Sequence, residues 1–435
     1  MMTRVLPRTI VCFLDTRALF NTRTLLPSSF LLSSLHQQHR QQQQQQYYRS
    51  FSTTITTTTT HNNHNNKNKD NMASDGAVHD VPFPPTIDEH LGEHLQPHEA
   101  EFTTKLASSI ERSLHLRYQA GEFRRDVHAR ATGTLKAKFK VHDNLPPQFA
   151  NKGVFIPGKT YDAILRLSNA SGDAAHSDKR QDGRGFAIKL LNVPGQKLLE
   201  SDKDAATQDF VMINHPIFFS NDTKSYLDLI NKSAPDATTL QKLTIPFTLG
   251  LKGTLVAGQL SSGKIGNPLQ VQYFSAVPYQ LGLGPDRIAV KYSAKPVIDE
   301  HDKDPIPHAP AADDYLHQAV KRTLSPTANK PVEFKFMIQP RVGHHMDVED
   351  SMKEWSQHES PFVEVATITI PPQDVDSEEL NKLGERLSFN PWHSLPDHRP
   401  LGSVNRTRKI VYERISRIRD EMNHVPREEP STTDG

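Results

Sequence analysis

The chain has 435 residues, and its 51 lysines and arginines nearly balance its 50 aspartates and glutamates, so the formal net charge is only +1. This overall balance gives no indication of a protein that binds nucleic acid or an anionic membrane through its bulk charge. The single cysteine is Cys12, so the rest of the chain has no disulfide framework, no cysteine-ligated metal and no thiol nucleophile. Any metal or cofactor there must use nitrogen or oxygen ligands.

The charge is unevenly distributed along the chain. Residues 1–71 contain eight basic and two acidic side chains, which leaves 43 basic against 48 acidic side chains for the remainder. The first part is rich in arginine, contains serine and apolar stretches, and is typical of a mitochondrial transit peptide. We therefore predict a transit peptide over residues 1–51, with a matrix-protease type sequence at 49–52, and a location in the mitochondrial matrix. The alternative is that this segment is only a disordered leader and that translation starts at Met72. The protein would then be cytoplasmic or peroxisomal.

Residues 52–79 are dominated by threonine, asparagine and histidine. Such polar, low-complexity sequence cannot bury enough apolar surface to offset the entropy of ordering, so we expect a disordered linker. No run of eighteen apolar residues occurs, which predicts that there is no transmembrane segment.

One domain is expected over residues 80–425, followed by a disordered tail over 426–435. Apolar residues recur every four positions from Phe102 to Leu114, which predicts a helix over 99–118. From Leu135 to Val141 apolar residues alternate with lysines, as in a half-buried antiparallel strand. Further strands are predicted over residues 163–168, 185–190, 209–214, 270–274, 287–292, 332–339 and 362–370, and a last helix over 405–422. This order predicts an α+β protein with a closed or sandwich-like antiparallel β core.

Residues that could bind a metal or tune its ligand share one face of the last predicted helix. Arg408, Tyr412 and Arg419 have the spacing of one helix face, and a guanidinium one turn from a phenol favours phenolate, an anionic oxygen ligand for ferric iron. The alternative interpretation is a solvated basic face on an ordinary helix.

Polar residues also occur where the strands predict buried positions. Arg166 and Ser168 alternate onto one face of the strand over 163–168, and such a face needs an anion or water. His128 precedes the first strand and Asn214 ends another. Taken singly, these two are most simply an ordinary histidine and a satisfied amide, and 183–186 is most simply a turn.

The joint pattern is more specific. The segments Val127-His128-Ala129-Arg130, Leu165-Arg166-Leu167-Ser168, 182–187, 214–219 and 408–412 have the order and approximate spacing found in haem catalases. The sequence therefore resembles the haem catalase family, most closely its shorter catalase-like peroxidase branch, from about residue 112 to residue 419. The resemblance implies a catalase-like antiparallel β-barrel with flanking helices and haem b between the barrel and a C-terminal helix.

The resemblance also implies a role for each matching residue. His128 and Asn214 match the distal pair, and Ser168 matches the serine that hydrogen-bonds the second ring nitrogen of the histidine. Tyr412 matches the iron ligand. The cofactor-binding positions are Arg408 beside that ligand, Arg125, Arg166 and Arg419 at the haem propionates, Val127 in the channel above the iron, and Phe219 and Tyr226 against the haem.

The function implied by the resemblance is decomposition of hydrogen peroxide, by catalase or peroxidase activity, in defence against oxidative stress. One alternative is a fatty-acid hydroperoxide enzyme similar to the allene oxide synthase branch, although that branch tends to have threonine where this chain has Val127. Another is a haem-binding or sensing protein without turnover. The expected partners are hydrogen peroxide or an organic hydroperoxide and further copies in a homodimer or homotetramer, with no nucleic acid. The sequence after Tyr412 departs from the usual family pattern, because Glu413-Arg414-Ile415-Ser416 replaces Pro-Asp-Thr-His, and this leaves NADPH binding and full catalatic turnover open.

Overall fold

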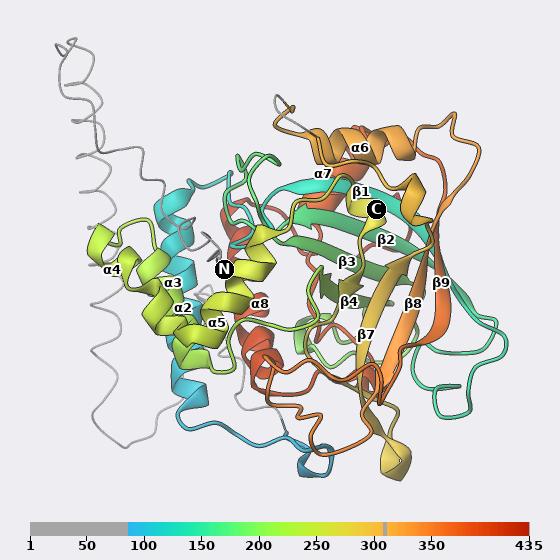
Figure 1. Cartoon of the computed structure of the whole chain (residues 1–435), viewed down its shortest axis with the longest axis horizontal. Coiled ribbons are helices and arrows are strands. Elements are labelled where there is room, and N and C mark those ends of the chain that lie inside the picture. Colours follow the sequence, from blue (N-terminus) through green and yellow to red (C-terminus); the bar gives the residue numbers. More distant parts are fainter. Residues whose placement is uncertain (1–85, 308–310, 435) are drawn as a thin grey trace, which may run out of the picture. The chain divides into compact units, whose positions relative to one another are not determined.

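The computed structural model describes residues 86–307 and 311–434 (Figure 1). The predicted transit peptide and linker, together with Cys12, lie outside these residues. No helix among the described residues is long and apolar enough to cross a membrane.

The centre of the fold is a closed antiparallel β-barrel. Its strands follow one another around the ring in the order β5-β4-β3-β2-β1-β9-β8-β7, and pairing of β7 with β5 closes it. The bounds of these strands are β1 (Ala131–Val141), β2 (Thr160–Asn169), β3 (Arg184–Leu191), β4 (Thr207–Ile213), β5 (Tyr273–Phe274), β7 (Ile288–Pro296), β8 (Val332–Pro340) and β9 (Val363–Ile370). A short strand, β6 (Tyr279–Leu281), pairs with β7 outside the ring. The predicted α+β class with a closed antiparallel barrel is confirmed, and the sandwich alternative is not formed.

The alternation of side chains decides which residues fill the barrel and which face outward. On β1, Leu135, Ala137 and Phe139 belong to the barrel core, so the intervening lysines point outward. On β2, Ala163, Leu165 and Leu167 belong to the same core. Residues 164, 166 and 168 therefore share the outer face of β2, and they are nevertheless buried, so other parts of the chain must cover this face.

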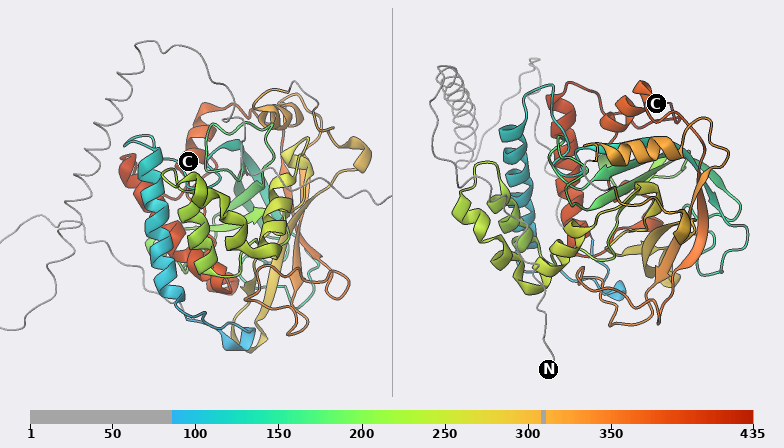
Figure 2. Two further views of the ribbon diagram at one scale, coloured as in Figure 1. Left: turned by 60° about the vertical axis from the view of Figure 1, so that its left-hand side comes forward. Right: turned by 45° about the horizontal axis from the view of Figure 1, so that its top comes forward.

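Helices supply that cover (Figures 1 and 2). On one side of the barrel lie α2 (Glu99–Arg117), α3 (Thr223–Ser233), α4 (Thr239–Leu243), α5 (Ile245–Ser262) and α8 (Ser403–Met422). The helices α6 (Tyr315–Thr323) and α7 (Glu378–Arg386) pack on β1. Leucine and isoleucine side chains of α2, including Leu106 and Ile110, form a shared core with Ile415 and Ile418 of α8. The two predicted helices are confirmed, whereas the sequence analysis did not predict α3 to α7.

A buried ion network fixes the start of α8. The Arg406 guanidinium is fully buried and contacts the carboxylates of Glu93, Glu99 and Glu349 at 3.1, 2.8 and 2.8 Å. These carboxylates come from the N-terminal arm, from α2 and from the loop that follows β8. One arginine therefore joins three distant parts of the chain to the helix that carries Tyr412.

The C-terminal segment differs from the expected disordered tail over 426–435. Glu429 lies 2.6 Å from the Lys189 ammonium of β3, which also lies 2.7 Å from Asp209 of β4. Lys189 and Asp209 are fully buried, and Arg427 pairs with Asp202 at 2.5 Å. Burial alone would lower the pKa of Lys189, but Asp209 and Glu429 raise it above its ordinary value. The segment packs against the barrel because its carboxylate compensates a buried cation 240 positions earlier in the chain.

Candidate active site

His128 stands just before β1 in a left-handed backbone conformation, with φ of +57°. Its N–H donates to the carbonyl of Ala170 at 3.1 Å, and its own carbonyl accepts from Arg166 Nη1 at 2.9 Å. The Oγ of Ser168 shares a hydrogen bond of 3.0 Å with Nδ1 of the imidazole. The backbone and one ring nitrogen of His128 are thus fixed by β2 and its following loop, which leaves Nε2 as the ring nitrogen able to exchange a proton with a ligand.

Gly185 of β3 makes room for this pair. It stands opposite Ser168 in the ladder, and a Cβ there would lie 2.5 Å from His128 Nδ1 and 2.7 Å from Ser168 Oγ. No side chain fits at those distances. Gly185 begins the strand predicted over 185–190, which is observed as β3, and the turn interpretation of 183–186 did not reveal that Gly185 leaves room for the His128 ring.

The imidazole of His128 is held in its neutral form. Burial, followed by the nearby cations Arg166 and Arg408, lowers its pKa from the ordinary 6.5 to about 4. A neutral imidazole at physiological pH can accept a proton and return it, as a general base and acid must.

Asn214 follows β4 and is hydrogen-bonded to Arg184, the residue before Gly185 in β3. Its Oδ1 accepts from the N–H of Arg184 at 2.7 Å, and its own N–H donates to the carbonyl of Arg184 at 3.0 Å. These bonds fix the orientation of the amide, so its NH2 group remains as a donor with no acceptor among the described residues. The simple interpretation of a satisfied amide therefore holds for its oxygen and not for its nitrogen.

Three arginines converge on the end of α7. Arg125 donates to the carbonyls of Gly384 and Leu387 at 2.8 and 2.5 Å, and Arg419 donates to that of Arg386 at 2.8 Å. The carboxylate of Glu385 lies 3.5 Å from Arg125 and 3.3 Å from Arg166. Burial, and then repulsion from Arg166 and Arg419, lowers the pKa of Arg125 well below its ordinary value.

This cluster has unused capacity for anions. The Nε of Arg166 is buried without a hydrogen-bond partner. Asp420, beside Arg419 at 3.1 Å, and Glu385 are the two carboxylates paired with the three guanidiniums. A ligand with carboxylates at this end would satisfy the orphan donor and compensate the excess positive charge. Glu385, the penultimate residue of α7, was not among the predicted site residues.

Arg408 and Tyr412 lie one turn apart on α8, as their spacing predicts. The guanidinium carbon of Arg408 is 5.0 Å from the centre of the Tyr412 ring, and its Nη1 donates to Asn405 Oδ1 at 3.1 Å. Burial alone would lower the pKa of Arg408, but the phenols of Tyr412 and Tyr279 raise it above its ordinary value. Tyr279 of β6 is thus a second phenol beside this arginine, and the sequence analysis did not identify it.

The remaining predicted residues lie around these groups. Val127 is half-buried beside His128. The rings of Phe219 and Tyr226 are 5.8 Å apart, and Tyr226 belongs to the α2–α8 cluster together with Tyr412. Burial, followed by the charges of Asp126 and Tyr412, raises the pKa of Tyr226. Arg166 of β2 and Arg419 of α8 both contact the end of α7, so α8 and the outer face of the barrel border one site.

The residues fit a haem group. A phenol oxygen beside a guanidinium suits ferric iron, the unused donor of Arg166 and its neighbouring arginines suit two propionates, and the aromatic rings suit the flat macrocycle.

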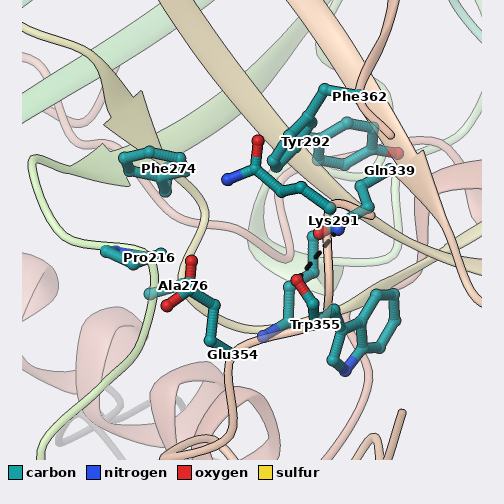
Figure 3. A pocket seen from close by; sticks show the side chains of 10 residues that line it. Pro216, Phe274, Ala276, Lys291, Tyr292, Gln339, Glu354, Trp355 and Phe362 are labelled. Atoms are coloured by element: carbon teal, nitrogen blue, oxygen red, sulfur yellow. Dashed lines mark hydrogen bonds between the residues drawn. The ribbon is translucent and has the colours of Figure 1, made fainter. Parts of the chain in front are cut away.

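A separate small pocket is lined by Pro216 and nine other residues (Figure 3). Its volume of about 10 Å³ holds no more than about one water molecule. The Lys291 ammonium lies 5.0 Å from the centre of the Trp355 ring, and burial lowers the pKa of Lys291 to about 8. This pocket is too small for a macrocycle and is not part of the candidate active site.

Known proteins share both the fold and part of the sequence. Solved structures of a fungal catalase and of catalase A from Saccharomyces cerevisiae superpose with TM-scores of 0.53 and 0.51. The matches cover 77% of this chain and 64% and 66% of those chains, at 16% and 19% identity. The structure is thus that of a catalase fold: a closed barrel with flanking helices.

Sequence comparisons match part of the chain to catalases. The Catalase family profile matches residues 117–247. Catalase from Latilactobacillus sakei is 33% identical over 116 residues, which are 26% of this chain and 22% of that protein. Catalase C from Rhizobium meliloti is 29% identical over 112 residues, 26% of this chain and 14% of that protein. These matches confirm the resemblance to the haem catalase family, and each spans less than a third of the relative's own length.

Proposed function

We propose that this chain binds haem b between the outer face of β2 and α8 and decomposes hydrogen peroxide, by catalase or peroxidase activity. The observation that carries the proposal is the neutral imidazole of His128, fixed through Nδ1 by Ser168, in a buried site that also contains the free amide donor of Asn214. The catalase-family relatives support a peroxide substrate.

In this proposal, Tyr412 would hold the iron, with the Arg408 guanidinium carbon 5.0 Å from the centre of its ring. Arg125, Arg166 and Arg419 hold the propionates, and Val127, Phe219 and Tyr226 line the group. Bound haem would supply the two-electron redox chemistry that no side chain of this site can perform.

The protein residues handle protons and orientation. His128 Nε2 would accept a proton from one peroxide oxygen and return it to the other, which is the proton transfer that release of water requires. The NH2 group of Asn214 donates to the peroxide oxygen on which charge develops. Ser168 keeps the imidazole in the orientation that both transfers need.

The test uses purified full chain loaded with haem. Hydrogen peroxide and a fatty-acid hydroperoxide are supplied separately, with and without an organic reductant, and oxygen, peroxide and lipid products are measured. Oxygen evolution supports catalase activity and reductant-dependent peroxide loss supports peroxidase activity. His128→Ala should retain haem and lose peroxide cleavage. Isomerised lipid as the only product would contradict the proposal in favour of the fatty-acid hydroperoxide alternative, and bound haem without turnover would favour the sensing alternative.

We further propose a role in oxidative-stress defence in the mitochondrial matrix and membership of the shorter catalase-like peroxidase branch. The arginine-rich composition of residues 1–51 supports the first. The sequence of residues 387–393, Leu-Ser-Phe-Asn-Pro-Trp-His, resembles that branch and supports the second.

A further inference from the structure

An apolar surface lies on α4 and α5, which face the viewer in the left view of Figure 2. Five large hydrophobic side chains are exposed there: Leu240, Leu243, Phe247, Leu251 and Leu255, at 73, 47, 85, 81 and 55%. They are five of the eleven exposed large hydrophobic residues in the described part of the chain, yet they fall within sixteen positions. We call these five residues the apolar patch, and such clustering marks an interaction surface.

The geometry of α5 directs the patch outward. Gly250 interrupts the helix with φ of +65°, and after it Leu251 and Leu255 stand four residues apart on one face. Gly253 and Val256 are buried on the opposite face. The helix therefore has one face packed on the protein and one apolar face without a partner among the described residues.

The charge around the patch has one sign. Residues 237–264 contain three lysines, Lys242, Lys252 and Lys264, and no aspartate or glutamate. The neighbouring acids, Asp228 and Asp236, are paired with Lys224 and Arg112. The apolar patch is thus surrounded by lysines whose charge the neighbouring acids do not balance, although the whole chain is close to neutral.

We infer that α4 and α5 dock on the surface of an anionic phospholipid bilayer. Apolar side chains on a short helical segment bury in the headgroup boundary, while nearby lysines attract anionic headgroups. Charge complementarity favours this occupant over a second copy of the chain, because pairing two such surfaces would bring like charges together.

Docking would orient the candidate active site toward the lipid. The inner side of α5 covers it: a Cβ on Gly183 would meet Leu260 at 2.5 Å, and one on Gly263 would lie 3.8 Å from Asn214 Nδ2. The inference does not rest on the proposed function, because lipid binding can be measured without peroxide.

The test is flotation of the full chain with vesicles of phosphatidylcholine, alone or mixed with phosphatidylglycerol. The parent protein should float with the mixed vesicles and bind less at high salt. The double variant Phe247→Glu, Leu251→Glu should bind about tenfold more weakly or worse, since two apolar contacts are lost and two charges repel the lipid. Circular dichroism should show an unchanged fold because both side chains are exposed.

Leu283→Glu is the matched control, because Leu283 is 56% exposed and lies outside the patch. It should float like the parent. Three outcomes would overturn the inference: a parent that does not float, a double variant that floats equally well, or equal loss in the Leu283 control. A fourth outcome would also overturn it: the parent sediments as a dimer and the double variant as a monomer. The patch would then be an interface between copies of the chain.

Discussion

Replacing Gly185 by alanine tests whether the strand pair β2–β3 sets the position of His128. The new Cβ would lie 2.5 Å from Nδ1, 2.7 Å from Cε1 and 2.7 Å from Ser168 Oγ. Since comfortable contacts between heavy atoms need about 3.5–4.0 Å, the imidazole or the hydroxyl must move by about 1 Å. Overpacking of this kind costs about 1–3 kcal/mol of folding free energy. A displacement of about 1 Å at a reacting group lowers the rate about 100-fold.

The assay compares the rate of peroxide loss, haem content and urea unfolding for the parent and Gly185→Ala. We expect a large loss of rate, near-parent haem content and a modest loss of stability. Gly258→Ala is the control, because a Cβ at Gly258 meets nothing within 4 Å. A Gly185→Ala protein with the parent rate would refute the reasoning, as would a Gly258→Ala protein with the same loss.

Three further predictions concern the buried ionisable side chains of His128 and Arg406. Because the pKa of His128 is lowered to about 4, peroxide turnover should stay constant at neutral pH and fall only as the pH drops through about 4. The free energy of unfolding should also fall between pH 6.5 and about 4, because in that range His128 binds a proton in the unfolded chain but not in the folded site. A peroxide turnover rate whose midpoint lies near pH 6.5 would contradict the lowered pKa. Arg406→Met should lose about 3–5 kcal/mol in urea unfolding, because it leaves the buried Glu99 and Glu349 without their cation, while Glu93 keeps only Arg399 at 2.8 Å. Lys105→Met, which removes an exposed ion pair with Glu101, should change the free energy of unfolding little. Equal losses in the two variants would contradict a special contribution of the buried Arg406 network to stability.

Features that depend on local periodicity could be predicted from the sequence. The alternation predicted Leu135 on the apolar face of β1 and Arg166 and Ser168 together on one face of β2, and in the structure Leu135 and Leu165 lie in the barrel core. The four-residue repeat predicted α2, and the stripe on Arg408 and Tyr412 predicted one face of α8. These patterns report burial directly, because side-chain direction follows from the backbone repeat.

Features that depend on contacts between distant segments could not be predicted. Glu385 joins the arginine cluster from another element, and Glu429 compensates Lys189 across 240 positions. Gly185 matters only through its neighbour across the ladder, Ser168. The helix α5 is apolar on its exposed face as well as its buried one, so no amphipathic period marks it.

The central claim is that Tyr412 holds a haem group in this chain. The most direct test measures haem content and the ferric absorption spectrum of full chain reconstituted with haem, for the parent, Tyr412→Phe and the nearby control Tyr226→Phe. The parent and the control should bind haem with a tyrosinate-type spectrum, and Tyr412→Phe should lose the spectrum or the haem. A parent that binds no haem, or a Tyr412→Phe protein with the parent spectrum, would contradict the claim.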